Sequence, residues 1–246
     1  MSSNDNNIKS RHWSRTLLVV ILFFGICGNA SDEGLVEVEP SIDYLAPYLH
    51  RRPSVGVLVA LGVEHFRPEK YRSVVDDNIY STIYENKVIP LPEVSITLRK
   101  NFSTFSMGAS LDYAMGSVTM AGTTKRELEL IKKAGSLSMY LDGLWEDPYL
   151  VPFLKVQYFT TTYHETVNGS SKAGQTSAAI SPRFGLMFNL NYLDPDPNAA
   201  RNGLRDSGLQ NTYLSVYYSQ NSTSNQSGDP DFESTANWGA NVVLEF

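Results

Sequence analysis

Seven charged residues of the chain stand among small or polar neighbours, so their chemistry depends on whether opposite charges meet. They are Glu64, Arg99, Asp112, Asp142, Lys155, Arg183 and Glu245. Each lies in or beside a segment where apolar and polar residues alternate, on the side that carries the small and polar side chains. A lone charge in a crowded interior is costly unless it is paired. We therefore expect a network of ion pairs, with Asp142 and Lys155, on either side of residues 146–148, as the preferred pair. Arg99 and Arg183 are expected to find carboxylates on neighbouring strands.

Histidine is the second residue type that could do chemistry, because a neutral imidazole is the commonest general base. Beyond residue 30 the chain carries His50, His65 and His164. His65 and His164 are expected at the upper ends of the first and fifth strands, at the level of a rim, but neither sits in the His-Ser or Asp-His pattern of hydrolases. No Gly-rich phosphate loop and no Cys/His cluster occurs in the sequence. We expect no catalytic residue, no cofactor and no metal site.

The elements that position these side chains are predicted to be β-strands. Apolar and polar residues alternate over eight segments, which lie around residues 55–64, 94–99, 105–116, 136–145, 154–158, 180–190, 212–218 and 237–246. A soluble β-sandwich would also alternate, but it buries its large apolar side chains and exposes its charges. A barrel in lipid inverts this pattern, and its tilted strands need ~9–11 residues, against ~5–6 in soluble proteins. Long strands with a small, charged polar face favour the membrane barrel.

The first thirty residues are predicted to be a secretory signal that is cleaved on export. Lys9, Arg11 and Arg15 precede an apolar run at residues 16–26, which is shorter than the ~20 residues of a spanning helix. Residues 28–30 (GNA) supply the small side chains of a cleavage site, and the chain's one cysteine lies just before them. An uncleaved anchor and a lipid-modified cysteine are the alternatives. No disulfide is expected in the remainder.

Charge and hydropathy narrow the class further. The chain has 20 Lys and Arg against 26 Asp and Glu, and the part after residue 30 carries a net charge of −8. That balance does not suit a nucleic-acid binder, which usually shows a basic patch. No stretch after residue 30 approaches 18 consecutive apolar residues, so any membrane crossing is expected to use strands.

The connections between the segments alternate in length. Short turns are expected at residues 100–102 and 146–148, and longer polar loops at 67–91, 117–133, 164–175 and 219–233. Short turns on one side and long loops on the other are typical of outer-membrane barrels, whose short turns are periplasmic. The stretch 191–208 is long although it falls on the short-turn side, and we expect a helical turn capped by Gly203 there.

The C-terminal residues carry a resemblance to a known family. Trp238, Ala240, Val242, Leu244 and Phe246 share one face of the last segment. This pattern resembles the C-terminal signal of bacterial outer-membrane barrels, a terminal aromatic residue preceded by alternating apolar positions. The resemblance implies an eight-stranded, antiparallel, up-and-down transmembrane β-barrel like those of the OmpA transmembrane domain, OmpX and OmpW. It also implies recognition of the C-terminus by the barrel-assembly machinery.

These inferences divide the chain into a signal peptide (1–30), a periplasmic segment (31–54) and a barrel (55–246). A strand in the segment 31–54 would raise the count toward ten, because such barrels favour even numbers. Trp145 and Tyr149 are expected at the membrane interface, where amphipathic rings are favoured.

We expect an outer-membrane protein of a Gram-negative bacterium, in contact with lipid and lipopolysaccharide, with a lumen plugged by its charges. Its role would be structural, adhesive or recognition of an unidentified extracellular ligand through the long loops. One alternative is a narrow channel for ions or small hydrophobic solutes. Another is a lipid-modifying enzyme that uses His65 or His164.

Overall fold

The eight alternating segments form strands in the computed structural model, which describes residues 47–120, 124–193, 203 and 207–246. The strands are β1 (Val55–Phe66), β2 (Ile89–Asn101), β3 (Ser106–Met120), β4 (Arg126–Tyr140), β5 (Leu150–Val167), β6 (Ser170–Gln175), β7 (Ala179–Asn189), β8 (Asn211–Asn221) and β9 (Ser234–Glu245). The short helices are α2 (Tyr48–Arg51), α3 (Tyr80–Tyr84) and the 3₁₀ turn η1 (Leu190–Leu193). No helix in this part of the chain is both long enough and apolar enough to cross a membrane.

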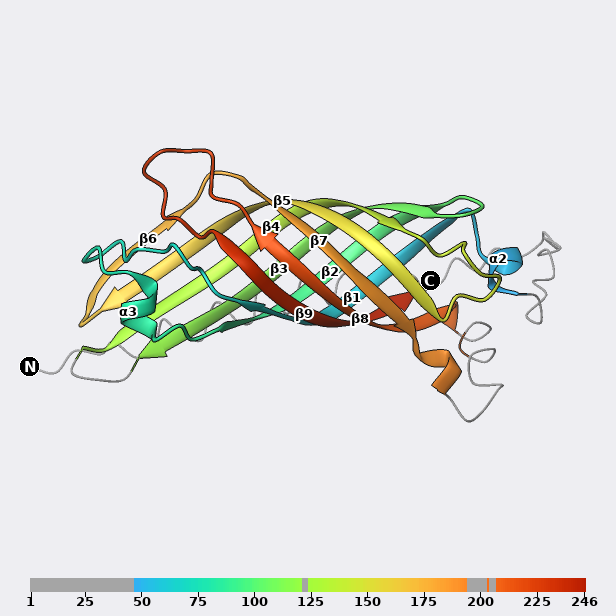
Figure 1. Ribbon diagram of the computed structural model, residues 1–246, viewed down its shortest axis with the longest axis horizontal. Helices are drawn as coiled ribbons and strands as arrows, with labels where there is room; N and C mark the ends of the chain where they lie inside the picture. Colours follow the sequence, from blue (N-terminus) through green and yellow to red (C-terminus); the bar gives the residue numbers. More distant parts are fainter. Residues whose placement is uncertain (1–46, 121–123, 194–202, 204–206) are drawn as a thin grey trace, which may run out of the picture. The chain divides into compact units, whose positions relative to one another are not determined.

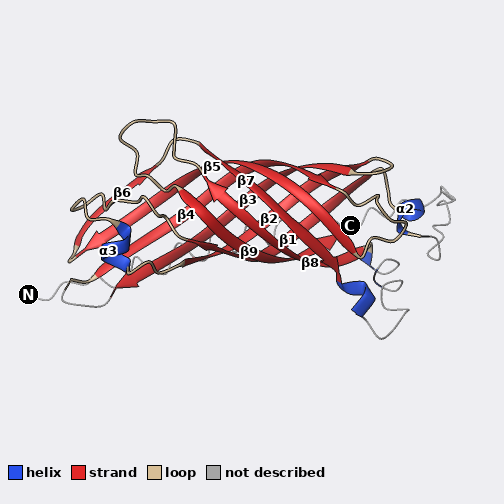
Figure 2. Ribbon diagram, in the orientation of Figure 1, coloured by secondary structure: helices blue, strands red, loops and turns tan. Residues whose placement is uncertain are grey.

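The strands close into an antiparallel barrel (Figures 1 and 2). Their order is β4-β3-β2-β1-β9-β8-β7-β5-β6, and a further pairing of β4 with β5 closes the cylinder. β6 and β7 occupy successive parts of the same edge of β5: β6 pairs with residues 162–167 and β7 with residues 150–159. They therefore act as one interrupted strand. With β6 and β7 counted together, the barrel has eight strands in meander order. The predicted eight-stranded antiparallel barrel is confirmed.

The strand register places the large apolar side chains of neighbouring strands together on the outer surface. Leu61 of β1 lies opposite Val94 of β2 and Val242 of β9, and all three face outward. Large apolar side chains are exposed on each of these eight strands: Val57, Leu61, Ile96, Leu98, Met107, Leu111, Met115, Leu137, Met139, Leu154, Val156, Tyr158, Ile180, Phe184, Leu186, Phe188, Leu214, Val216, Trp238 and Val242. We call this set the apolar belt. Leu111, near its middle, is 76% exposed.

Three strands continue beyond the apolar belt at the barrel end where β1 ends and β9 begins. β3 reaches Met120 and β4 begins at Arg126, so most of the predicted loop 117–133 is strand. The predicted loop 164–175 is likewise the hairpin between β5 and β6. The outward side chains there are polar, among them Thr119 and Glu129, which explains why the residues suggested a loop. Antiparallel pairing persists because the opposite face of this sheet extension is packed.

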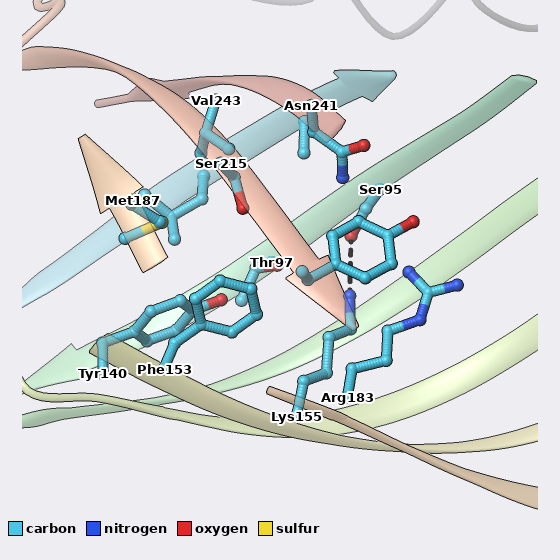
Figure 3. Close-up of a pocket in the computed structure, with 13 residues that line it drawn as sticks. Ser95, Thr97, Tyr140, Phe153, Lys155, Arg183, Met187, Ser215, Asn241 and Val243 are labelled. Carbon is cyan, nitrogen blue, oxygen red and sulfur yellow. Dashed lines mark hydrogen bonds between the residues drawn. The ribbon is translucent and has the colours of Figure 1, made fainter. Parts of the chain in front are cut away.

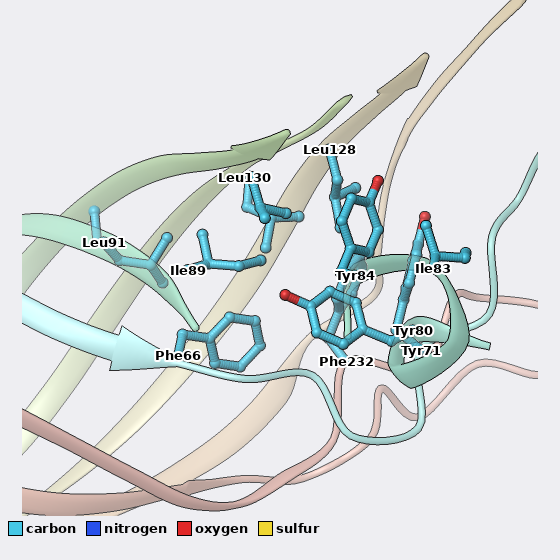
Figure 4. Packing of buried hydrophobic residues seen from close by; sticks show 12 residues of the cluster. Phe66, Tyr71, Tyr80, Ile83, Tyr84, Ile89, Leu91, Leu128, Leu130 and Phe232 are labelled. Carbon is cyan, nitrogen blue, oxygen red and sulfur yellow. The ribbon is translucent and has the colours of Figure 1, made fainter. Parts of the chain in front are cut away.

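The packing on that face comes from the loop between β1 and β2. Its helix α3 and neighbouring residues enter the barrel end and build an aromatic and aliphatic cluster (Figure 4). Tyr71 stacks on Phe232 from the last loop, with ring centroids 4.9 Å apart, and Tyr84 is fully buried. This end of the barrel is thus covered by side chains of its own loops.

The other end, where β1 begins and β9 ends, is covered by residues just before β1. Tyr48 of α2 is 1% exposed, and its backbone N–H donates to Asp147 Oδ1 at 2.7 Å. Residues 47–54 hold a helix and not an added strand; the predicted signal and residues 31–46 lie outside the described residues. So does most of the 191–208 turn, including the residues around Gly203, of which only η1 and a few others are described.

Candidate functional site: the charged lumen

The lumen at the end where β1 begins and β9 ends holds a cluster of two arginines and two carboxylates. We call it the mouth cluster: Arg52, Arg99, Asp142, Glu245 and the hydroxyl of Tyr48. Asp142 Oδ2 lies 3.0 Å from Arg52 Nη1 and 3.3 Å from Arg99 Nη1. Arg99 also pairs with Glu245, and Tyr48 donates to Glu245 Oε1 at 2.6 Å. Both carboxylates and Arg99 are 1% exposed. The positive and negative charges balance.

The second group lies farther along the lumen and consists of Glu64, Glu93, Lys132 and Arg183, the central cluster. Arg183 binds both carboxylates, with Nη2 2.6 Å from Glu64 Oε2 and Nη1 3.0 Å from Glu93 Oε2. Lys132 Nζ lies 3.3 Å from Glu64 Oε2. Neutral donors complete the shell: Tyr217 donates to Glu93 Oε1 at 2.7 Å, and Ser219 donates to Glu64 Oε1 at 2.9 Å. The remaining oxygen of each carboxylate is thereby satisfied, as a buried ion pair requires.

Between the two clusters lies the ion pair of Asp112 and Lys155, whose atoms Oδ1 and Nζ are 2.6 Å apart. Lys155 also donates to Ser95 Oγ at 3.3 Å, as Figure 3 shows. The cavity in this figure has a volume of about 40 Å³, enough for a few water molecules and too small for a solute. Five cations and five carboxylates of the described residues thus neutralise one another inside the barrel.

All seven charges singled out in the sequence lie in the lumen, but two expectations about their partners are wrong. Asp142 does not pair with Lys155: it binds Arg52 and Arg99, while Lys155 binds Asp112. The arginines do find carboxylates, though not on neighbouring strands. Strand β1 separates Arg99 on β2 from Glu245 on β9. An eight-stranded lumen is narrow enough for a long side chain to reach across it, so pairing is not limited to adjacent strands.

Sequence reasoning missed three charged members of these clusters. Glu93 follows two outward prolines at positions 90 and 92, where inward Ile89 and Leu91 reverse the usual alternation. Lys132 was hidden in a stretch that resembled a loop. Arg52 precedes the first strand, directly after α2, so no strand alternation marks it. The one available signal was the alternation of Leu128 and Leu130 with Glu127 and Glu129, which keeps Lys132 in phase with the inward positions.

The two rim histidines face away from the lumen. The ring of His65 stacks on the exposed Trp238, with centroids 3.8 Å apart. His164 Nδ1 lies 3.4 Å from Glu129 Oε2 on the outer surface of the sheet extension, with both side chains about half exposed. Its sequence neighbour Glu165 points to the other face and is buried. The histidines are therefore placed on separate strands of the outer surface.

The other residues singled out in the sequence occupy the outer surface and the strand ends. Trp145 and Tyr149 are exposed and stacked, with centroids 5.4 Å apart, in the turn between β4 and β5. Phe246 pairs with Val57 through two backbone hydrogen bonds of 2.8 Å, which joins the C-terminus to the first strand. The alternate residues from Trp238 to Phe246 face outward, as predicted from their spacing.

Comparison with known proteins yields only distant structural likeness. No family model matches the chain. No curated protein matches it either. Among solved structures, Ail of Yersinia pestis is 10% identical (TM-score 0.47; 79% of this chain and 100% of that chain covered). Neisserial surface protein A is 13% identical (TM-score 0.40; 78% and 96% covered), and the N-terminal β-barrel domain of Pseudomonas aeruginosa OprF is 11% identical (TM-score 0.41; 78% and 97% covered). Likeness this distant carries no argument about function, and the barrel assignment rests on the chain's own strand pairing.

Proposed function

We propose that this chain is an outer-membrane barrel protein of a Gram-negative bacterium that acts in adhesion or recognition through its loops. One observation carries the proposal: the barrel exposes its large apolar side chains and buries its charges. The apolar belt runs over all eight strands of the barrel and is far larger than the apolar patches found on the water-exposed surfaces of monomeric proteins. Such a belt is stable when the hydrocarbon core of a membrane surrounds it.

The dimensions of the apolar belt support the same location. On β3 the outward apolar run extends from Met107 to Met115, and on β7 from Ile180 to Phe188. Each spans nine residues, which matches the ~9–11 residues of a tilted membrane-spanning strand. The exposed rings of Trp145 and Tyr149 lie just beyond the belt, where an interfacial position in contact with headgroups is favourable. In this proposal, lipid and lipopolysaccharide surround the belt, and the outward C-terminal residues serve the barrel-assembly machinery.

The closed lumen argues against transport as the main role. Its ion pairs leave a cavity of only about 40 Å³ between the clusters, and side chains cover both ends of the described barrel. A conducting path would require the Arg183 pairs to part, which costs several kcal/mol per uncompensated ion. Recognition through the long loops is the role that the architecture leaves to the chain.

In this proposal the loop end of the barrel faces the outside of the cell and the end with the short turns faces the periplasm. This orientation can be tested by inserting an epitope tag at each end of the barrel. A tag after Ser224, in the loop between β8 and β9, should be labelled by antibody on intact cells of a Gram-negative host. A tag after Gly143, in the turn between β4 and β5, should be labelled only after permeabilisation. The reverse pattern would contradict the proposed orientation, and release of both tagged proteins in soluble form would contradict the membrane location.

A further inference from the structure

A cleft at the loop end of the barrel is not explained by packing or by the lumen. It lies between residues 70–77 of the first loop and residues 228–231 of the last loop, with Tyr163 of β5 and Lys172 of β6 as its third side. We call it the loop cleft. Its volume of about 710 Å³ falls within the roughly 300–1,000 Å³ of small-molecule sites.

The walls of the loop cleft are tied to one another and to the barrel. Glu69 N–H donates to the Glu233 carbonyl at 3.0 Å, and the Lys70 ammonium pairs with the Glu233 carboxylate at 2.8 Å. Lys172 Nζ donates to the Val74 carbonyl at 2.6 Å. These contacts join the first loop both to the last loop and to β6. A ligand would therefore meet a largely preformed site, which lowers the ordering cost of binding.

A buried carboxylate of β5 also holds the first loop in place. Glu165 Oε2 accepts hydrogen bonds from Tyr71 (2.9 Å), Ser73 (3.0 Å) and the Val74 N–H (2.9 Å). Burial, followed by the nearby Glu165 charge, raises the pKa of Tyr71, so its hydroxyl stays protonated and can donate. The backbone that forms one wall of the cleft is thus held in a single position over the sheet extension.

The charges that line the loop cleft nearly cancel. Lys70, Arg72 and Lys172 supply three cations, and Asp76, Asp77, Asp229 and Asp231 supply four carboxylates. Two of these charges have partners outside the lining, since Asp76 pairs with Arg126 and Lys70 pairs with Glu233. Hydrogen bonding to Arg126 holds the pKa of Asp76 well below its ordinary value. The cleft therefore has no strong field of either sign, which would be needed to concentrate a polyanion or a polycation.

Several lining groups retain hydrogen-bonding capacity within the described part of the chain. The Arg72 side chain is 61% exposed and its nearest carboxylate, Asp77, lies at 3.8 Å. Asp231 uses Oδ1 to accept the Glu233 N–H at 2.9 Å, which leaves its other oxygen. Donors and acceptors of this kind, spaced around a cleft, suit the hydroxyl groups of a sugar, which act as both donor and acceptor.

The lining also includes one aromatic ring. Tyr163 lies across Gly174 of β6, where a Cβ atom would come within 2.5 Å of the tyrosine hydroxyl. Only glycine at this position lets the ring lie against the strand. An aromatic ring with a polar tip offers an apolar surface to a ligand that is otherwise hydrophilic. A pyranose, with C–H groups on one face and hydroxyls around its edge, matches that combination.

We propose that the loop cleft binds a neutral oligosaccharide, with Arg72, Asp77 and Asp231 as hydrogen-bonding groups and Tyr163 as a contact surface. This inference rests on the proposed function, because it assigns a ligand class to loops placed outside the cell. It differs from general adhesion in naming one site and one chemistry.

The test is calorimetric titration of the full chain in a detergent without a sugar headgroup, such as lauryldimethylamine oxide. The probes are maltohexaose, mannohexaose and N-acetylchitohexaose, with dextran sulfate and polylysine as charged comparators. At least one neutral probe should bind, and Arg72→Gln should weaken that binding by about tenfold, as expected for hydrogen bonds from a charged donor. The matched control is Lys133→Gln on the exposed outer face of β4, which should leave the affinity unchanged.

Three results would overturn the inference: no binding of any neutral probe at millimolar concentration, binding only of the charged comparators, or equal affinity in Arg72→Gln and Lys133→Gln. Each variant is first shown to migrate as a folded, heat-sensitive band, so misfolding is not mistaken for lost binding. The proposed function fails separately, through the tag-labelling pattern, and survives if only the ligand class is wrong.

Discussion

Arg183 of β7 and Glu64 of β1 meet across the lumen, with Nη2 and Oε2 2.6 Å apart, although β8 and β9 separate their strands. Because Arg183 also holds Glu93, this one guanidinium connects β7 to β1 and β2. The barrel is therefore braced through its interior as well as around its circumference.

Removing the Glu64 charge should strongly destabilise the barrel. Glu64→Gln leaves Arg183 and Lys132 with a single carboxylate between them, and breaking such a buried pair costs about 3–5 kcal/mol. The measurement is urea-induced unfolding in lipid vesicles. Glu129→Gln, on the exposed outer face of β4, is the control and should shift stability by less than about 0.5 kcal/mol. Equal midpoints for the two variants would show that the central cluster does not support the fold.

The closed lumen predicts that the wild-type chain is electrically silent. Reconstituted in planar bilayers, it should give no discrete conductance steps, because the neutralised ion pairs fill the space between the two covered ends. Reproducible single-channel steps from purified protein would contradict the closed lumen and restore the channel alternative.

The apolar belt predicts a position-dependent cost of charge on the outer surface. Leu111→Arg places a guanidinium near the middle of the belt and should cost about 2–4 kcal/mol. Thr119→Arg, eight residues farther along the same face of β3 and beyond the belt, should cost about 0–1 kcal/mol. Both values come from unfolding in vesicles. Similar costs at the two positions would mean that no hydrocarbon surrounds Leu111.

The close contacts around Gly239 of β9 predict that the lumen has no space for an added methyl group at this position. A Cβ atom there would lie 2.3 Å from Cζ of Tyr217, whose hydroxyl donates to Glu93 at 2.7 Å. Gly239→Ala should therefore displace the ring, break that hydrogen bond and cost about 1–3 kcal/mol. Gly135→Ala is the matched control, because a Cβ at that strand position meets nothing within 4 Å. If the two variants have the same unfolding midpoint, the lumen can accommodate the added methyl group and is not tightly packed around Gly239.

The fold was readable from the sequence because one physical pattern runs through every strand. Alternation with a two-residue period, large apolar groups on one face and single charges on the other, predicted the barrel and the burial of Glu64 and Arg183. The ion-pair partners were not readable, because strand spacing along the chain says nothing about which side chains meet across a narrow lumen. The pairing of Asp142 with Arg52 depends on how the segment with α2 covers the barrel mouth.

The structure at the loop end of the barrel could not be predicted from the sequence for a different reason. Inward residues there are apolar, as at Leu128 and Leu130, while outward residues are charged, so the membrane pattern reverses within a single strand. The loop cleft was equally hidden, because it brings together Arg72, Tyr163 and Asp231 from three distant parts of the chain.

The central claim, a barrel embedded in the outer membrane, is tested most directly by heat-modifiability of the protein extracted from that membrane. Wild type and a variant that lacks Phe246 are compared on SDS gels with and without boiling. We predict that unboiled wild type migrates as a compact band that boiling converts to a slower one, and that the variant yields little of the compact form. Recovery of the wild-type protein in the soluble periplasmic fraction, with no heat-sensitive band, would contradict the membrane barrel.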